Sequence, residues 1–220
     1  MTIGHSGPWW SLVRFGFRLL YNELAFTYDT VSYIVSLGAW RCWQRSALKH
    51  LNAPSAGPVL ELAHGTGDLQ YDLFRLGYNA TGADLSPYMG RIARAKLNRC
   101  GVPTKLVRAR AQQLPFATGT FAAVVCTFPT EFIFAPQTLY EAHRVLRADG
   151  QLVIVPVGVF NKQGAAQASL EWLYRITGQR DSGPGDAGAL FSPYGFAATL
   201  FQEDCTRSSA QVIVARKGSL

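Results

Sequence analysis

The feature that most constrains this chain is a glycine turn set between a short apolar strand and a helix. Residues 59–62 (VLEL) predict a buried strand, Gly65-Thr66-Gly67 forms the turn, and a helix is expected over residues 68–76. A second strand, expected over residues 79–83, ends at Asp84. Glycine lets the backbone approach a ligand closely, and a helix N-terminus offers unpaired N–H groups. Because the Asp84 carboxylate has the two acceptors that a ribose diol requires, this unit predicts a nucleoside-like ligand.

The rest of the chain continues to alternate between strands and helices. Ser86 as N-cap and Pro87 as first helical residue begin a helix that runs to about Cys100. Further strands are expected at 105–109, 121–127, 151–157, 196–202 and 210–216, and further helices at 135–146 and 165–176. This order predicts an α/β fold: a doubly wound, mostly parallel, seven-stranded Rossmann-like sheet with a C-terminal antiparallel hairpin. Function is then expected at the carboxyl ends of the parallel strands.

Composition and linkers predict two parts. A Pro/Gly/Ser-rich segment at 52–58 separates an aromatic helical lid, residues 1–52, from a ligand-binding domain, residues 53–220. A hydrophobic fraction of 48% and a charged fraction of 16% favour a sizeable core and exclude bulk disorder. No uncharged apolar run approaches the ~18 residues of a membrane span, and the first residues lack the basic start of a secretory signal. These features predict a cytoplasmic protein.

The four cysteines stand far apart in the sequence, at Cys42, Cys100, Cys126 and Cys205. There is no C-x-x-C pair and no histidine at ligand spacing, which argues against a metal site. The same spacing argues against a disulfide framework, so isolated thiols are expected.

The net charge of +7 is partly local, because residues 91–110 carry seven basic side chains and no acidic one. Such a patch fits the phosphates of nucleic acid or anionic lipid, or it is a solvated helix face. The solvated face is the favoured interpretation.

Four segments together resemble the class I S-adenosylmethionine-dependent methyltransferases. They are VLELAHGTGDL (59–69), GADLSPYM (82–89), RAQQLPFATGTFAAVVCTF (110–128) and HRVLRADGQLVIV (143–155). Within this family the chain is similar to the methyltransferase type 11 group and, more loosely, to the ubiquinone/menaquinone-biosynthesis C-methyltransferases. The looser likeness rests on Tyr28-Asp29, Ser36-Leu37-Gly38 and Trp43.

The resemblance implies a site for S-adenosylmethionine. Gly65, Thr66 and Gly67, flanked by Ala63 and His64, would hold the methionine half, and Glu61 would lie near its amine. Asp84 would bind the ribose, and Thr127 with Phe128 would lie under the sulfonium. The adenine would be flanked by Leu85, Arg110, Ala111 and Gln112.

Two residues depart from the family pattern. Ala63 replaces a usual glycine, which is tolerable if φ is negative there. Arg110 stands where relatives often have aspartate, and a guanidinium has no acceptor for the adenine amino group. Adenine recognition would then rest on the Ala111 backbone or on Gln112.

Candidate catalytic residues are fewer. Glu131, just after the expected fourth strand, is placed to act as a general base on the acceptor, or it is a capping or solvated acid. Tyr28 enters the candidate catalytic set through the resemblance. His64 is more simply a polar filler of an outward-facing turn, and His143 a structural residue.

The N-terminal segment 9–22 predicts a helix with a narrow polar stripe and a wide apolar face. The apolar face fits a lid over the acceptor pocket, or a helix resting on a membrane or a dimer partner.

The sequence therefore predicts an enzyme that moves a methyl group to a small apolar or amphipathic acceptor, quinone-like or lipid-like. A non-catalytic cofactor-binding protein and a nucleic-acid methyltransferase remain as alternatives. The second lacks a clear N/D-P-P-Y/F/W motif, and Gln70 interrupts the G-x-G-x-x-G fingerprint of nicotinamide dehydrogenases.

Overall fold

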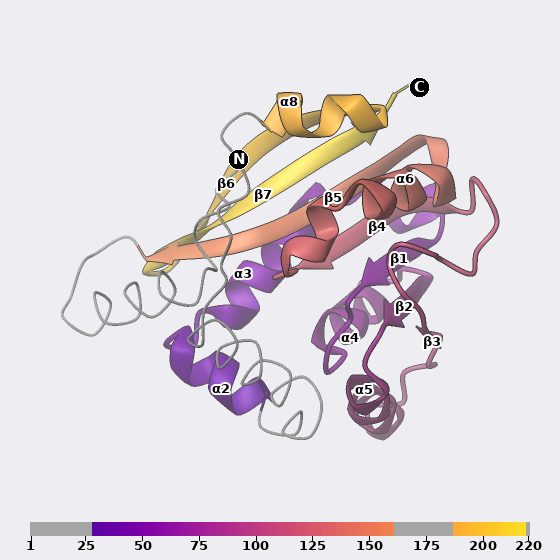
Figure 1. The fold of residues 1–220 in the computed structure, drawn as a ribbon. Coiled ribbons are helices and arrows are strands. Elements are labelled where there is room, and N and C mark those ends of the chain that lie inside the picture. Colours follow the sequence, from indigo (N-terminus) through magenta and orange to yellow (C-terminus); the bar gives the residue numbers. More distant parts are fainter. Residues whose placement is uncertain (1–27, 161–186, 219–220) are drawn as a thin grey trace, which may run out of the picture.

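The computed structural model describes residues 28–160 and 187–218 of the chain, which form a layered α/β structure (Figure 1). Its seven-stranded sheet has the order β3-β2-β1-β4-β5-β7-β6. The strands are β1 (Val59–Leu62), β2 (Ala80–Asp84), β3 (Leu106–Arg108), β4 (Phe121–Thr127), β5 (Leu146–Phe160), β6 (Phe196–Cys205) and β7 (Ser208–Lys217). β1 to β5 run parallel, whereas β7 is antiparallel to both β5 and β6. The predicted doubly wound sheet with a C-terminal hairpin is confirmed.

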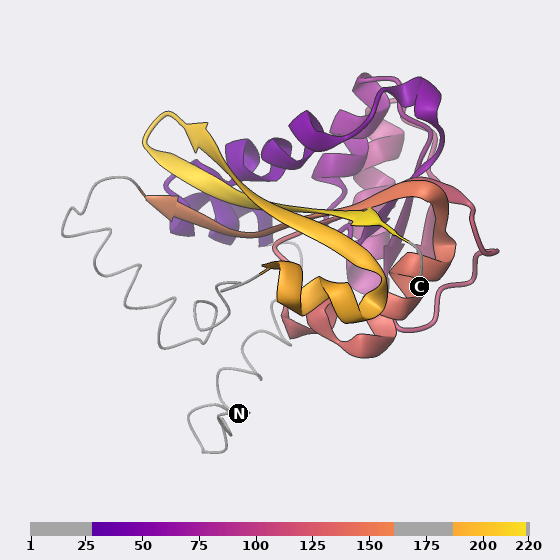
Figure 2. The ribbon, with the colours of Figure 1, turned by 90° about the horizontal axis from the view of Figure 1, so that it is seen from above.

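Helices cover both faces of the sheet (Figures 1 and 2). The α-helices are α2 (Tyr28–Val35), α3 (Trp40–Ser46), α4 (Asp68–Arg75), α5 (Pro87–Arg99), α6 (Pro136–Val145) and α8 (Ala187–Phe191). Short 3-10 turns are η2 (Ala47–His50), η3 (Pro54–Ala56), η4 (Glu131–Phe134) and η5 (Ser192–Tyr194). Helices expected over 9–22 and 165–176 lie outside the described residues.

The central strand β4 explains the two-sided packing. All seven of its residues are buried, and successive side chains point to opposite faces of the sheet. Val124 and Cys126 belong to the core cluster that contains α6 and α8, whereas Ala123 and Val125 belong to the cluster that contains Trp43 and helix α4. The continuous apolar run therefore fills two cores at once.

Local signals place several element boundaries. The Ser86 hydroxyl accepts a hydrogen bond from the Met89 N–H at 3.3 Å, and Pro87 occupies the first turn, so α5 begins as predicted. The helix expected over 135–146 instead ends at Val145, because β5 already begins at Leu146. The hairpin strands are ten residues each, longer than expected, since they pair with each other along their whole length.

The expectation of four isolated thiols is wrong for one pair. Cys42 on α3 and Cys205 at the end of β6 form a disulfide, with their Cα atoms 6.2 Å apart. The two residues are separated by 163 positions, and the fold brings them together where the turn of the β6–β7 hairpin reaches α3. Sequence spacing carries no information on such a contact. Cys100 and Cys126 are free, one exposed and the other buried.

Candidate functional site

Three predicted parts of the site meet at the carboxyl ends of adjacent strands. β1 lies between β2 and β4, with Leu62 in register with Ala83 on one side and Cys126 on the other. Asp84 and Thr127 each follow directly in these neighbouring strands. The sheet thus gathers the glycine turn, the β2 acid and the end of β4 on one edge.

The glycine turn is held by the carboxylate of Asp84. Its Oδ2 accepts from the Gly65 N–H at 3.0 Å, and its Oδ1 accepts from the Ser86 N–H at 2.8 Å. Both turn glycines have positive φ, +54° at Gly65 and +87° at Gly67. A Cβ built on Gly65 would meet nothing within 4 Å, whereas one on Gly67 would lie 3.0 Å from the Cβ of Ala93 on α5. Gly67 therefore allows the turn to pack closely against α5, whereas the position of a Cβ at Gly65 is open space.

Glu61 is a buried acid with one buried partner. The Gln70 amide donates to Glu61 Oε2 at 2.7 Å, and burial raises the pKa of Glu61 to about 8. Both side chains are almost fully buried. Gln70, noted in the sequence only for the glycine it replaces, thus orients the acid at the end of β1.

His64 does not face outward as expected. It is buried, its Nδ1 lies 2.9 Å from the carbonyl oxygen of Gly65, and burial lowers its pKa. A Cβ built on Gly82 of β2 would lie 2.9 Å from the imidazole ring, so Gly82 makes room for His64. The polar-filler interpretation is wrong, because the side chain turns inward against β2.

Ala63 and Phe128 both occupy the left-handed region, with φ of +53° and +49°. The condition under which an alanine would be tolerable at 63, a negative φ, is therefore not met. Non-glycine residues in this region are strained, and such residues gather at functional sites. Here they end the two central strands β1 and β4.

Helix α3 lies against the end of β4. The indole of Trp40 stacks on the Phe128 ring at 3.9 Å between centroids, and Gln44 Nε2 donates to Thr127 Oγ1 at 3.4 Å. Trp40 and Gln44 are one helical turn apart, so one face of α3 points at the strand end. Neither Trp40 nor Gln44 is among the predicted site residues, because no short-range sequence pattern joins α3 to the end of β4.

A contact from helix α2 also reaches the glycine turn. The Thr66 hydroxyl donates to Asp29 Oδ1 on α2 at 2.6 Å. Lys96 of α5 bridges Asp29 and Asp68 at 2.9 and 2.7 Å. One member of the basic patch is therefore engaged within the protein rather than offered to a phosphate.

Most of the residues predicted for adenine follow strand β3, which pairs with β2 as far as Asp84. Asp84 is in register with Arg108, and the Ala109 N–H donates to the carbonyl oxygen of Asp84 at 3.1 Å. The chain continues from there through exposed Arg110, half-buried Ala111 and exposed Gln112, and Leu85, which follows Asp84, is also exposed. Arg108 Nε donates to the Leu85 carbonyl oxygen at 3.1 Å and ties the two segments together.

The two candidate catalytic residues differ in what can be described. Glu131 is exposed and begins η4, three residues after Phe128. Tyr28 begins α2, and its side chain lies outside the described residues. Both roles stay predictions.

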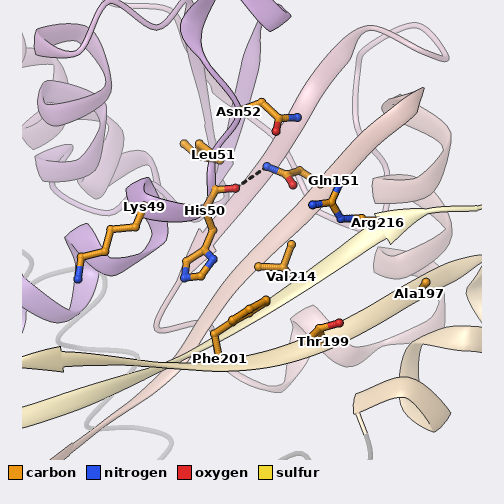
Figure 3. A pocket seen from close by; sticks show the side chains of 10 residues that line it. All are labelled: Lys49, His50, Leu51, Asn52, Gln151, Ala197, Thr199, Phe201, Val214 and Arg216. Atoms are coloured by element: carbon orange, nitrogen blue, oxygen red, sulfur yellow. Dashed lines mark hydrogen bonds between the residues drawn. The ribbon is translucent and has the colours of Figure 1, made fainter.

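A cavity of about 290 Å³ lies elsewhere, between η2 and the strands β5, β6 and β7 (Figure 3). Its wall includes Gln151 and Arg216, which pair in register near the beginning of β5, away from the strand ends that carry the predicted site. Beside it Glu203 accepts from Lys49 at 2.7 Å and contacts His50 at 2.8 Å, and these partners lower the pKa of Glu203. The predicted site and this cavity are separate.

Two features are absent from the part of the chain that the structure describes. Residues 28–160 and 187–218 contain no group of His, Cys, Asp and Glu side chains placed to hold a metal ion. Within the same residues, no helix has the length and apolar character needed to cross a membrane.

The strand order and the site together define a Rossmann-like methyltransferase fold. The sheet has parallel strands in the order β3-β2-β1-β4-β5 and an antiparallel β7-β6 pair, a glycine turn follows β1, and an acid ends β2. Residues 60–154 match the family model described as a methyltransferase domain. The chain belongs to the class I S-adenosylmethionine-dependent methyltransferases.

Two sequence relatives and one solved structure show what this chain is similar to. The demethylmenaquinone methyltransferase of Thermus thermophilus is 35% identical over 149 residues, 64% of this chain and 68% of that protein. The ubiquinone/menaquinone biosynthesis C-methyltransferase of Citrifermentans bemidjiense is 32% identical over 145 residues, 63% of this chain but only 61% of that protein's length. A solved SAM-dependent methyltransferase of Thermotoga maritima has a TM-score of 0.62 at 17% identity, covering 88% of this chain and 96% of that one, and shows the fold alone.

The site's geometry fits the cofactor of this family. The open space at Gly65 would accept a ligand against the backbone, and a fixed carboxylate at Asp84 is suited to a diol. The buried Glu61 can gain stabilisation from a ligand ammonium, because opposite charge offsets the cost of burying an ionised carboxylate.

Proposed function

We propose that this protein transfers a methyl group from S-adenosylmethionine to a small, apolar or amphipathic, quinone-like acceptor. The observation that carries the acceptor class is the stack of Trp40 on Phe128 at the end of β4, which gives the site an aromatic wall. The names of the relatives at 32–35% identity support the same class. In this proposal the lid is residues 1–52 and the cofactor domain is residues 53–220.

The proposed cofactor site follows the strand ends. The Gly65–Gly67 turn with Ala63, His64 and Thr66 would line the methionine half, and Glu61 would face its ammonium. Asp84 would bind the ribose hydroxyls with lone pairs left free by its two backbone bonds. Leu85 would pack against the adenine, and the Ala111 backbone and Gln112 would read its edge because Arg110 has no acceptor.

When bound, the cofactor supplies a methyl group on a positively charged sulfur. The chain's own part is alignment: Thr127 and Phe128 at the end of β4 would position the sulfur side, and Trp40 the acceptor side. Glu131, exposed at the beginning of η4, would accept the proton that the acceptor releases. Tyr28, the first residue of α2, is proposed as a second catalytic residue.

Residues 9–22 are proposed to rest on a membrane surface, where an apolar acceptor would be concentrated, with the protein otherwise cytoplasmic. Exposed Tyr33, Ile34 and Leu37 extend the apolar character of the lid into α2 and its end. Co-sedimentation of the full chain with anionic vesicles tests this surface. Salt-resistant dimers without vesicle binding would instead assign the segment to a homodimer contact.

Calorimetric titration with S-adenosylhomocysteine tests the cofactor site. Asp84→Asn should weaken binding by about 1.5–3 kcal/mol, the range for hydrogen bonds to a charged group. Asp149→Asn, exposed at the opposite end of the sheet, is the matched control and should bind like the wild type. Unchanged affinity in Asp84→Asn, or tight binding of NADH in place of S-adenosylhomocysteine, would overturn the cofactor assignment.

Methyl transfer to a reduced 1,4-naphthoquinone tests the acceptor class. Turnover should be present with S-adenosylmethionine and absent without it. Full cofactor binding with no transfer to any quinol would leave the family intact and reject the acceptor.

A further inference from the structure

Helix α3 is held by three different neighbours within its seven residues. Trp40 and Gln44 contact the end of β4. Arg41 and Arg45 both pair with the buried Asp72 carboxylate of α4, at 2.6 and 2.9 Å. The remaining side of the helix faces the β6–β7 hairpin.

The hairpin side is fixed by a covalent bond and a buried hydrogen bond. Cys42 is bonded to Cys205, and Trp43 Nε1 donates to Ser208 Oγ at 2.9 Å. The Trp43 indole lies flat against Gly158 of β5, where an added Cβ would collide with the ring. Movement at the hairpin is therefore transmitted to the same helix that carries Trp40 and Gln44.

The disulfide joins an exposed residue to a half-buried one. Cys42 is exposed and Cys205 is half-buried, whereas the thiol of Cys126 is fully buried. Thiol–disulfide exchange requires that a thiolate reach one of the two sulfurs, so exposure makes the bond exchangeable. A disulfide in a reducing compartment is usually of this reversible kind.

We propose that Cys42–Cys205 is a reversible redox site that fixes α3 against the β6–β7 hairpin and thereby sets the position of Trp40 and Gln44 over the strand ends. Its effect on catalysis rests on the proposed function. The oxidised protein is the form with the ordered acceptor wall, and reduction loosens that wall while the glycine turn and Asp84 keep their places in the parallel half of the sheet.

The exchange balances with a dithiol as reductant. A reductant thiolate attacks Sγ of Cys42, the more exposed residue of the pair, which forms a mixed disulfide and releases the thiolate of Cys205. The second thiol of the reductant then attacks the reductant sulfur that is bonded to Cys42. This step closes a disulfide within the reductant and releases the Cys42 thiolate. Two electrons and two protons pass to the protein, and the reductant leaves as a disulfide.

Alkylation and mass spectrometry of the folded full chain test exchangeability. In buffers of increasing dithiothreitol, peptides containing Cys42 and Cys205 should gain the alkyl group together, while Cys100 reacts at every potential. Alkylation of either residue without reductant would show that the bond is absent. Resistance of the bond to excess dithiothreitol in the folded protein would show a purely structural disulfide; either result overturns the proposal.

Hydrogen exchange tests transmission to α3. Reduction should speed amide exchange in residues 40–46 by about tenfold, since the helix loses its covalent link to the hairpin and keeps only non-covalent contacts to α4, β4, β5 and Ser208. The Cys42→Ser/Cys205→Ser variant without reductant should match the reduced wild type, and Cys100→Ser should match the oxidised one. Equal exchange rates in both redox states would overturn the proposal whether or not the protein is a methyltransferase.

Turnover of the naphthoquinol probe separates this proposal from the proposed function. Reduction should lower kcat/KM by about tenfold through misplacement of the acceptor wall, with the dissociation constant of S-adenosylhomocysteine changed less than about twofold. Equal turnover in both redox states would remove the catalytic role of the site and leave the proposed function standing. Loss of turnover in both states, with the exchange difference kept, would reject the acceptor and retain the redox site.

Discussion

At the scale of single residues, the backbone of Ala63 is strained because an alanine occupies a conformation that favours glycine. With φ of +53°, a Cβ is held in the region that glycine occupies freely. Ala63→Gly should therefore raise the free energy of unfolding by about 0.5–1 kcal/mol, the strain relieved minus the extra chain entropy of glycine. Urea unfolding measures the change. Ala83→Gly in the adjacent strand, where φ is not positive, should lower it, and the same sign for both would refute strain at Ala63.

Glu61 makes the stability of the free protein depend on pH. Burial raises its folded pKa from 4.5 to about 8, so between these values the unfolded chain loses a proton that the folded chain retains. The free energy of unfolding should then fall as pH rises through this window. Glu61→Gln removes this contribution. The free energy of unfolding of the variant, relative to that of the wild type, should therefore increase by on the order of 3 kcal/mol between pH 5 and pH 8.

Thermal unfolding of both proteins at the two pH values measures that gain. S-adenosylhomocysteine binding provides a second readout, because an ammonium beside Glu61 would lower its pKa and release a proton at neutral pH. Calorimetric enthalpies should thus vary with the ionisation enthalpy of the buffer in the wild type and not in Glu61→Gln. A constant stability difference across the window would show that Glu61 is ionised in the fold.

At the scale of elements, the contact between α3 and β5 depends on the absence of one methyl group. A Cβ at Gly158 would collide with the Trp43 indole, which is fully buried and hydrogen-bonded. Gly158→Ala should lower the free energy of unfolding by about 2–3 kcal/mol, at the upper end for overpacking. Gly90→Ala is the matched control, because a Cβ there meets nothing and lies inside α5, and it should stabilise by about 0.5–1 kcal/mol.

Elements were predictable from sequence where the signal is local. β1 and β4 have their predicted bounds because each is a short, mostly apolar segment that is buried along its whole length, and α5 begins at its Ser86-Pro87 signal. The inward turn of His64 depends on room left by Gly82, a neighbour across the sheet. The pairing of Gln70 with Glu61 joins the end of a strand to a helix, and no short-range pattern encodes it.

At the scale of the whole molecule, the order of strands and helices in the sequence predicts the sheet but not the long-range side-chain contacts. The carboxyl ends of β1, β2 and β4 gather the predicted residues because parallel strands must end on one side. The Cys42–Cys205 bond and the Gln44–Thr127 contact span 163 and 83 positions, and only the assembled fold defines them.

The disulfide should also contribute to global stability. A cross-link between residues 163 positions apart restricts the unfolded chain, and the chain-entropy model gives up to about 5 kcal/mol. Guanidinium unfolding of the oxidised wild type against Cys42→Ser/Cys205→Ser measures this contribution. Cys100→Ser should unfold like the wild type, and a double variant as stable as the wild type would show that the bond adds no constraint.

The position of β7 between β5 and β6 has a consequence for synthesis of the chain. β5 ends at Phe160, yet the strand that pairs with its outer edge begins only at Ser208. While the ribosome adds the intervening residues, the apolar edge of β5 stays open to other strands. A nascent or truncated chain that stops before residue 208 should therefore aggregate through β5, and chaperone binding should persist until the last strand has emerged and inserted.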